Sequence, residues 1–519
     1  MLHRSLAFTS DKSKDLQQQK IGRRRSTSSH NVITDDFKEA SRSILGEIYF
    51  FTLDQTSQVL ENFKSSGVGH DAGSLQLPTD NPIKHFNNAG CSPQPLPVLQ
   101  KVIQHNLLES VLGGYLAAEQ CQNERDLVYW VISKLINAQD PLEIALVESA
   151  TVAWTRVFYA MCDCLNCGDN GTGDSDVILC CEAEYAANIV AIEKICKERD
   201  ATLIMIPADK GMVDMDEFTK ILNGEWSYYE FYEDTMEKGK KILNPDRIRM
   251  VCITHIPTNS GIINPVYEIG DAIEEFNKKR KKGKKHPLYY LVDACQSVGQ
   301  IDVDVAEMKC HALSATGRKY LRAPRGTGFL YVKKDIADKL VPQQVDHAAA
   351  PIKRVPIDEV EDIEYEFPEG ALRFEFWEKN IANQLGLGLA VNYAIKKDMG
   401  WIEEQCITLA MELKGQLRKL NVATGGKIYV HHENLDHDST QCGIVTFAVR
   451  GIDSASIKED LLAFNFVVSV VPPTSTPFDS SNYGLNEIEL LRVSLSYFNT
   501  EEEILDFSSA LKTIISDEN

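Results

Sequence analysis

The stretch SATGRKYLRAPRGTGFLYV, residues 314–332, places Lys319 between a polar turn and a Gly/Pro-rich loop. The run that follows the loop is typical of a buried strand, and two arginines, Arg318 and Arg322, lie close to the lysine. A lysine that reacts with a carbonyl near a bound anion needs this setting, whereas a solvated surface lysine does not. We therefore interpret Lys319 as a reactive amine.

The segments before this stretch alternate between apolar strands and amphipathic helices. Apolar runs at 176–185, 201–209, 248–256 and 287–295 are separated by helical patterns that include 186–200 and 267–280. Near-continuous apolar strands between amphipathic helices indicate a mostly parallel sheet covered on both faces. The sequence thus predicts an α/β fold, with a large domain over residues 81–385.

Beyond residue 385 the pattern changes. A long helical stretch at 383–420 is broken near Gly400, strand-like segments follow, and a last helix opens with a capping box of Thr500 and Glu503. This order predicts a smaller C-terminal α+β domain over residues 386–519. Residues 1–80 form an N-terminal extension, with a helical pattern at 35–51. Its first part is basic and rich in Ser and Gln, as in disordered tails.

The totals exclude several classes of protein. The net charge of -21 argues against a partner such as nucleic acid or an anionic membrane, because the summed field repels phosphate. No apolar run approaches the roughly 20 residues that cross a bilayer. The 13 cysteines lie in apolar segments, which indicates reduced, buried thiols. We expect a cytoplasmic protein; mitochondrial import is the weaker alternative, since the Arg- and Ser-containing N-terminus also holds Asp11 and Asp15.

Two polar residues stand at the end of the apolar run 287–295. Asp293 directly follows five apolar or aromatic residues, and Gln296 comes three residues later. In open α/β sheets the carboxyl ends of the strands form the edge where ligands bind. A helix N-cap or a structural ion pair is the alternative role for Asp293. Lys319 comes one strand-like segment later and can reach the same edge.

A carboxylate, an amide and a lysine at one sheet edge suit pyridoxal phosphate (PLP). This cofactor needs a lysine for a Schiff base and an anion beside its ring nitrogen. Its phosphate needs an anion site, and residues 148–161 open a helical pattern with Ser149 and Thr151. Simple N-capping is an equally compatible role for those hydroxyl residues. Thr316 and Arg318 are placed to complete the anion site.

These motifs resemble the class V aminotransferase family of fold type I PLP enzymes. The resemblance is carried by LVDACQSVGQIDVDV, by the stretch around Lys319 and by LRVSLSYFNTEEEI, and it runs from about residue 84 to 515. The tail and an insert at 224–243 fall outside it. The family includes cysteine desulfurases, isopenicillin N epimerase-like proteins and C–S lyases. The resemblance implies a seven-stranded sheet, PLP as cofactor and a homodimer.

The resemblance also implies roles for single residues. Lys319 would form the Schiff base, Asp293 would pair with the pyridine nitrogen, and Gln296 would contact the ring oxygen. Tyr185 falls where desulfurases have a histidine stacked on the ring, and an aromatic face can do the same. His255 stands where desulfurases usually have an asparagine, close to the ring oxygen.

Further residues are expected to bind the phosphate and the substrate. The expected phosphate ligands are Ala150, Thr151, Thr316 and Arg318. Arg492 matches the arginine that binds the substrate carboxylate, a role that suits a guanidinium fork. Asn88, in the FNNAG motif, is the second expected substrate contact.

Cysteine is missing from one segment where desulfurases need it. Their mobile cysteine lies before the carboxylate-binding arginine, but residues 470–493 contain none. This argues against a desulfurase that transfers sulfur as a persulfide. Two thiol clusters, at 162–167 and 180–181, are interpreted as buried or surface thiols because no histidine is nearby, so we expect no metal site.

The sequence therefore predicts a PLP-dependent enzyme that acts on an amino acid or a similar small molecule. A C–S lyase reaction is favoured, with Lys319 as the base that removes the α-proton. An epimerase or a transaminase of the same family is the alternative. A non-catalytic scaffold that keeps the fold is the alternative from another class of protein.

Overall fold

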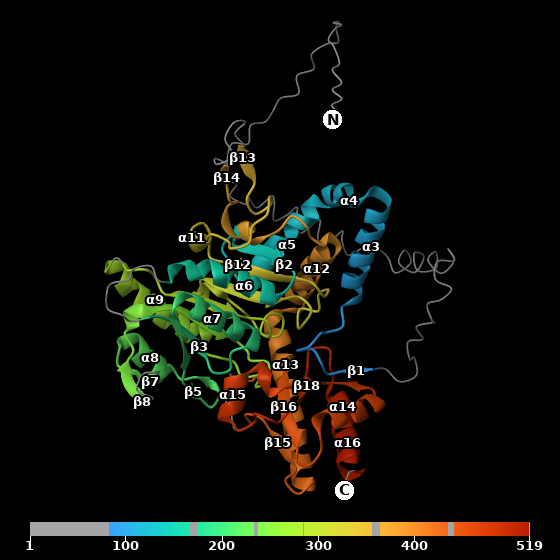
Figure 1. Ribbon diagram of the computed structural model, residues 1–519. Coiled ribbons are helices and arrows are strands. Elements are labelled where there is room, and N and C mark those ends of the chain that lie inside the picture. Colours follow the sequence, from blue (N-terminus) through green and yellow to red (C-terminus); the bar gives the residue numbers. More distant parts are fainter. Residues whose placement is uncertain are drawn as a thin grey trace, which may run out of the picture. The chain divides into compact units, whose positions relative to one another are not determined.

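The computed structural model describes residues 83–165, 175–232, 237–283, 285–354, 364–433 and 441–517 (Figure 1). The predicted N-terminal extension, residues 1–80, with its expected helix at 35–51, lies outside the described residues. All of the described residues belong to one compact unit. The expected division of this unit between residues 385 and 386 stays a prediction.

The largest sheet among the described residues has seven strands and is covered by helices (Figure 1). Its strands, in order across the sheet, are β2 (Ile144–Val147), β12 (Gly328–Val332), β11 (Ala312–Thr316), β10 (Tyr289–Asp293), β9 (Ile248–Thr254), β3 (Asp176–Cys181) and β4 (Ala201–Ile206). Neighbouring strands are parallel except at β12, which is antiparallel to both β11 and β2. The predicted α/β class and mostly parallel sheet are confirmed.

Helices cover both faces of this sheet, because successive side chains of each strand point to opposite faces. In β10, Leu291 packs in one core with Trp154 and Phe158 of a helix, whereas Tyr290 and Val292 belong to the other core. The first core is formed with α6 (Ala150–Met161) and α7 (Ala186–Arg199), and the second with α5 (Gln122–Leu135), α8 (Met215–Asn223), α9 (Val266–Lys282) and α12 (Ile381–Lys397). Burial on both faces explains the near-continuous apolar runs.

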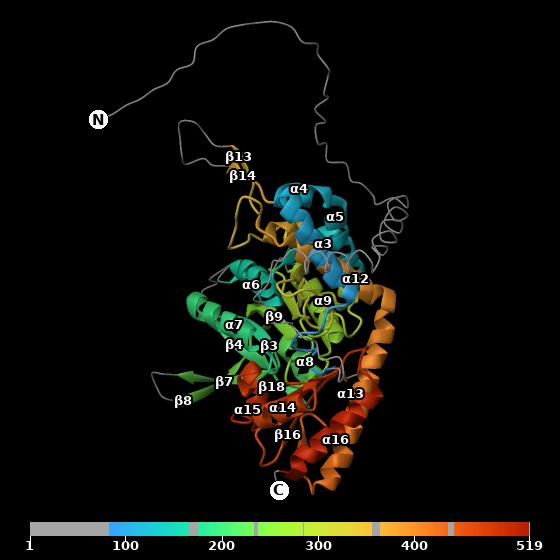
Figure 2. The same ribbon diagram turned by 90° about the vertical axis from the view of Figure 1, so that its right-hand side faces the viewer.

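A second, antiparallel sheet of four strands lies toward the C-terminus. Its order is β15 (Ile428–Val430), β16 (Ile444–Val449), β19 (Leu490–Ser494) and β18 (Ser469–Val471), and it packs with α13 (Met399–Ala423), α14 (Ser454–Ala463) and α16 (Glu501–Asp517). Helices α13 and α16 lie side by side (Figure 2).

Two local predictions for this region hold. The helical stretch breaks at Asp398, whose φ is +75°, so α12 ends and α13 begins beside the expected Gly400. The capping box is formed, since Glu503 N donates to Thr500 Oγ1 and Thr500 N donates to Glu503 Oε2, each at 3.2 Å.

An N-terminal strap, residues 84–92, connects the two sheets. Its strand β1 (Lys84–His85) pairs in parallel with β17 (Phe466–Val467) beside the smaller sheet. At the other end of the strap, Ser92 N donates to Arg318 O at 2.9 Å, in the loop that carries Lys319. The strap therefore spans from the C-terminal region to the predicted reactive lysine.

The remaining elements are short or peripheral. The predicted insert is a pair of antiparallel strands, β7 (Ser227–Tyr232) and β8 (Glu237–Ile242). Others are α3 (Leu96–Leu112), α4 (Gly114–Gln120), α10 (Val305–Met308), α11 (Lys334–Ala337), α15 (Pro477–Asn482), the strand pair β5 (Ala208–Asp209) and β6 (Met212–Val213), and the pair β13 (Ile352–Arg354) and β14 (Glu364–Tyr365). Among the described helices, none is both long and apolar enough to span a bilayer.

Candidate active site

A cavity opens at the carboxyl edge of the large sheet, where β2, β9, β10 and β11 end. It encloses about 470 Å³ of empty space, part of which is open to solvent. The predicted residues that line it are Ala150, Thr151, Tyr185, Asp293, Gln296, Thr316, Arg318 and Lys319. The edge-of-sheet argument thus brings these residues together, as parallel strands require.

Lys319 lies in the turn after β11, against a closely packed backbone. Gly299, with φ of +94°, faces this turn, and a Cβ on Gly299 would lie 2.5 Å from Leu321 N. Burial lowers the pKa of Lys319, and the nearby charges of Arg492 and Arg318 lower it further. A lysine with a lowered pKa is more often neutral, which is the nucleophilic form of the amine.

Asp293 ends β10 at the cavity and is held by two donors. Its Oδ2 accepts from Asn188 Nδ2 at 2.9 Å, and its Oδ1 accepts from Cys295 N at 2.9 Å. Burial raises the pKa of Asp293, while these hydrogen bonds oppose the rise. A cationic ligand group beside Asp293 would favour its ionised form further.

Behind Asp293 lies a second carboxylate, Glu184, that the sequence analysis missed. Asn188 Nδ2 also donates to Glu184 Oε1 at 2.7 Å, so one amide connects both carboxylates. Thr254 donates to Glu184 through its hydroxyl at 2.5 Å and its backbone N at 2.9 Å. Burial and the charge of Asp293 raise the pKa of Glu184 to about 7. Its place just after strand β3 is the signal that would have found it.

The cavity offers an anion site and an unpaired acceptor. Helix α6 begins at Ala150 beside the cavity, and Ser149 caps it by accepting from Val152 N at 3.2 Å. Gln296 Nε2 donates to Thr258 Oγ1 at 3.1 Å, but its Oε1 is buried with no partner among the described residues. A helix N-terminus suits a phosphate, and the unpaired Oε1 suits a hydroxyl donor. These groups fit PLP.

Arg492 lies just behind the cavity wall, on β19. Its Nη1 donates to Thr258 Oγ1 at 2.5 Å, and its Nε donates to Ser469 Oγ at 3.2 Å. Burial lowers the pKa of Arg492 to about 10. Thr258, which lines the cavity and was not predicted, therefore links Arg492 to Gln296. The guanidinium is held by neutral oxygens, so its charge is available to an anionic ligand.

Three predicted residues do not line the cavity: Arg492, which lies just behind its wall, His255 and Asn88. His255 is buried at the end of β9, neither ring nitrogen has a partner in the described structure, and burial lowers its pKa to about 3. Asn88 uses its amide to join Ser494 O at 2.8 Å and Ser92 Oγ at 2.8 Å. Their expected contacts with the cofactor ring and the substrate stay predictions.

The two arginines beside Lys319 differ in place. Arg318 lines the cavity, and its guanidinium also donates to Gly90 O. Arg322 instead donates to Pro93 O and to Tyr497 Oη, each at 2.9 Å, so it fastens the lysine loop to the N-terminal and C-terminal segments.

Comparison with known families settles the class of protein. Residues 85–235 and 225–507 match the family described as aminotransferase class-V. This chain belongs to the class V aminotransferase family. The two matched ranges meet where β7 and β8 lie, which agrees with an insert at that point.

Similar proteins support the same placement. A probable cysteine desulfurase of Synechocystis sp. is 25% identical over 448 residues, which cover 84% of this chain and 91% of that protein. The apo structure of a cysteine desulfurase from Thermococcus onnurineus has a TM-score of 0.68 at 19% identity, covering 84% of this chain and 95% of that one. The cystine C–S lyase C-DES, in complex with cysteine persulfide, has a TM-score of 0.63 at 18% identity, covering 83% and 97%. At these identities the structural likeness concerns the fold.

The predicted family, fold type I architecture, enzymatic nature and PLP cofactor are thereby confirmed. The roles of the individual site residues rest on the geometry above and are part of the proposal that follows.

Proposed function

We propose that this chain is a PLP-dependent C–S lyase that acts on cysteine or a cysteine-like amino acid. The observation that carries the proposal is the cavity in which Lys319, with a lowered pKa, shares the walls with Asp293 and the N-terminus of α6. The relatives named as cysteine desulfurases and the cystine C–S lyase of the same fold support this substrate class.

Each residue of the site has its own proposed role. Lys319 Nζ would hold the cofactor and would accept the α-proton of the substrate. Asp293, fixed by Asn188 and Cys295 N, would pair with the ring nitrogen of the cofactor and favour its protonated form. PLP, when bound, supplies an electron sink for the negative charge that develops at the α-carbon. Thr151, Thr316 and Arg318 bind the phosphate at the start of α6.

The substrate carboxylate is assigned to Arg492. Thr258 fixes the guanidinium from the cavity side, so the fork is oriented before the substrate arrives. Tyr185, 39% exposed, stands at the cavity as the group that stacks on the cofactor ring. Both assignments come from the resemblance, and the geometry is compatible with them.

The sulfur is proposed to leave the enzyme directly. Residues 470–493 contain no cysteine that can accept it as a persulfide. Cys295 is a thiol of the cavity wall, but burial raises its pKa, and a protonated thiol is a poor nucleophile. Cleavage of cysteine by elimination, with addition of water, yields pyruvate, ammonia and sulfide.

We further propose a homodimer in the cytoplasm. An exposed apolar patch supports the dimer: Val111 and Tyr115 are 79% and 81% exposed, and the Tyr115 ring lies 6.3 Å from that of Trp377, 53% exposed. The free state of the described cysteines supports the reducing compartment.

The test is product analysis after incubation of the holoenzyme with cysteine and with cystine. We expect pyruvate and ammonia in equal amounts, accompanied by sulfide from cysteine, and none of them from Lys319→Ala. Alanine with a protein-bound persulfide would instead indicate a desulfurase. Racemised substrate or a keto acid that retains sulfur would indicate the epimerase or the transaminase. Sedimentation equilibrium gives the oligomeric state.

A further inference from the structure

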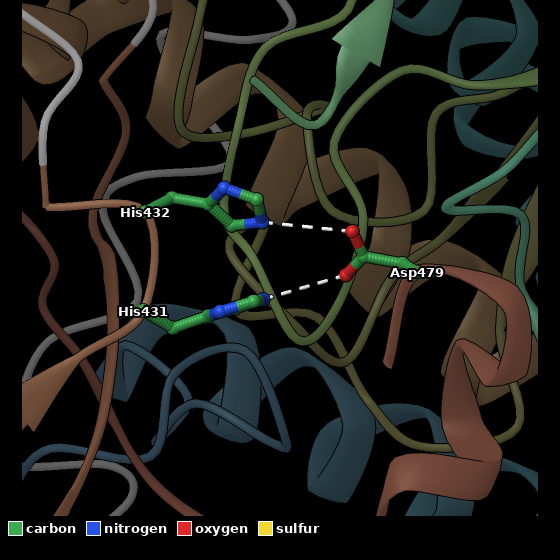
Figure 3. Close-up of side chains that lie close together, drawn as sticks. All are labelled: His431, His432 and Asp479. Atoms are coloured by element: carbon green, nitrogen blue, oxygen red, sulfur yellow. Dashed lines mark hydrogen bonds and ion pairs between the residues drawn. The ribbon is translucent and has the colours of Figure 1, made fainter. Parts of the chain in front are cut away.

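A second group of polar side chains is buried outside the cofactor cavity. It consists of His431 and His432, which follow β15, and Asp479 of α15 (Figure 3). His431 Nε2 lies 3.4 Å from Asp479 Oδ2, and His432 Nε2 lies 3.5 Å from Asp479 Oδ1. Among the described residues this is the one group of three such side chains whose ligand atoms lie within 4.8 Å of one another.

The backbone is arranged to bring two adjacent imidazoles together. Successive side chains of an extended chain point to opposite sides. His432 has φ of +52°, and this left-handed turn sends its ring to the same side as His431, with ring centroids 3.9 Å apart. Gly211, with φ of +85°, leaves the room, since a Cβ there would lie 2.5 Å from His432 Cε1. His432, one of the two imidazoles, is thus held in a sparsely populated backbone region, as is common at functional sites.

The surroundings orient the three side chains, each of which is between 1% and 3% exposed. Tyr429 Oη lies 3.1 Å from His431 Nδ1, so this nitrogen can carry the proton and leave the Nε2 lone pair toward Asp479. His432 Nε2 is buried without a hydrogen bond in the described structure. The Tyr483 ring covers both imidazoles, at 4.5 and 5.3 Å between centroids.

His431 Nε2 and Asp479 Oδ2 form a long hydrogen bond of 3.4 Å, and both nitrogen–oxygen distances also agree with a shared ion. An N–H···O hydrogen bond is about 2.9 Å long. Nitrogen and oxygen ligands about 2.0–2.1 Å from a tetrahedral zinc lie about 3.4 Å from one another. We propose that His431, His432 and Asp479 bind a divalent zinc ion, with water as the fourth ligand. The chemistry of the ligands, two imidazoles and one carboxylate, is that of zinc sites.

The ion would fasten the segment between β18 and β19. Asp479 N donates to Glu182 O at 3.2 Å, and Asn482 Nδ2 donates to Glu182 Oε2 at 2.5 Å, so α15 also contacts the segment just after β3. Strand β19 then carries Arg492. The ion would therefore hold α15 against β15, and its ligands are separate from the residues of the cofactor cavity.

Another buried histidine provides a matched control. His105 has Glu109 Oε1 at 3.1 Å from Nε2 and Cys121 Sγ at 3.6 Å from Nδ1. These partners lie on opposite ring nitrogens, so no single ion can bind both groups through this ring. His105→Gln thus removes a buried imidazole that has a carboxylate and a thiol as neighbours but no such site.

The test is zinc binding by the holoenzyme. The protein is stripped with a chelator and titrated with zinc against a chromophoric competitor, and bound metal is counted by mass spectrometry. We expect one ion per chain, with a dissociation constant below about 1 µM, in the wild type and in His105→Gln. His432→Gln and Asp479→Asn should bind that ion at least about a hundredfold more weakly.

Two further measurements test whether the bound ion lies at these three residues. Cobalt in place of zinc should give visible bands without the charge-transfer band of a thiolate, and a wild-type crystal measured at the zinc absorption edge should show the ion between the three residues. Equal zinc binding by the wild type and Asp479→Asn, a thiolate band, or an ion located elsewhere would overturn the proposal. The cluster would then be an ion pair of histidine and aspartate.

Discussion

The cofactor cavity and the histidine cluster are both buried and both join distant segments, but they are assembled differently. In the cavity, Asp293 and Thr316 end neighbouring parallel strands, so the register of the sheet places them. In the cluster, His432 and Asp479 meet because a left-handed turn and a short helix bring them together. The residues at the edge of a sheet can be predicted from where the strands end in the sequence. Contacts between loops leave no such pattern.

The two regions also differ in the charged side chains that they contain. Lys319, Arg318 and Arg492 surround the cavity, and the hydrogen bonds of both arginines named here go to neutral oxygens. The cluster instead sets one carboxylate against two imidazoles, at distances too long for good hydrogen bonds. The cavity thus offers cationic groups to anions beside the single carboxylate of Asp293 in its lining, whereas the cluster offers its three side chains to a cation. Each of the following predictions tests one side of this contrast.

The largest effect is expected at Lys319. Lys319→Ala removes the group that attaches the cofactor and moves the α-proton, so the rate of pyruvate release should fall at least about a thousandfold. Zinc binding should stay as in the wild type, because the two regions share no residue. Lys334→Ala, at a half-buried lysine that pairs with Asp140 and Glu369 outside the cavity lining, is the control. Loss of zinc in Lys319→Ala would show that the two regions are coupled.

The second-largest effect is expected at Glu184 and is measured as the pH dependence of the free energy of unfolding. Its pKa is about 7 when folded and 4.5 in the unfolded reference, so the folded state binds the proton more tightly. The contribution of Glu184 to the free energy of unfolding is complete below about pH 4.5 and is lost as the pH rises through 7. The free energy of unfolding changes by about 3 kcal/mol over this range. In cofactor-free protein, Glu184→Gln should abolish this loss and unfold at higher denaturant concentration at pH 8. If the stability of the wild type and that of Glu184→Gln changed with pH in the same way, the raised pKa of Glu184 would be refuted.

Arg492→Lys comes third. A lysine offers one point of charge in place of a fork, so the KM for cysteine should rise about ten- to a hundredfold with a smaller change in kcat. Arg418→Lys is the matched control, because Arg418 forms an exposed pair with Glu433 at 2.9 Å and such pairs contribute little. A fall in kcat alone would show that Arg492 does not bind the substrate carboxylate.

The smallest effect is expected at Thr258. Thr258→Val removes the hydroxyl that accepts from both Arg492 and Gln296, which should raise KM by about three- to tenfold. Thr219→Val, on helix α8, serves as the control, since its hydroxyl bonds only to Met215 O in the described contacts. Steady-state kinetics on both variants gives the comparison, and equal KM values would contradict the linking role.

How much of this could be read from the sequence depends on the kind of contact. Lys319 and Asp293 were predictable because strand ends and the loop after them have a local pattern. Arg492 was recognisable only through the family resemblance. Asn188 and Thr258 were missed because their partners Asp293 and Arg492 lie far along the chain and hydrogen bonding leaves no periodic signal. The histidine cluster was missed, and no metal site was expected, because a left-handed residue at His432 is not visible in its neighbours.

The N-terminal strap has a practical consequence for anyone who shortens this chain. Residues 84–92 supply a parallel partner to β17 and accept or donate hydrogen bonds at Ser494 and Arg318. A truncation that removes Lys84 and the residues after it would therefore leave an unpaired strand edge at one end and a loosened lysine loop at the other. Shortened or tagged versions of the enzyme should therefore keep Lys84 and every residue after it unchanged.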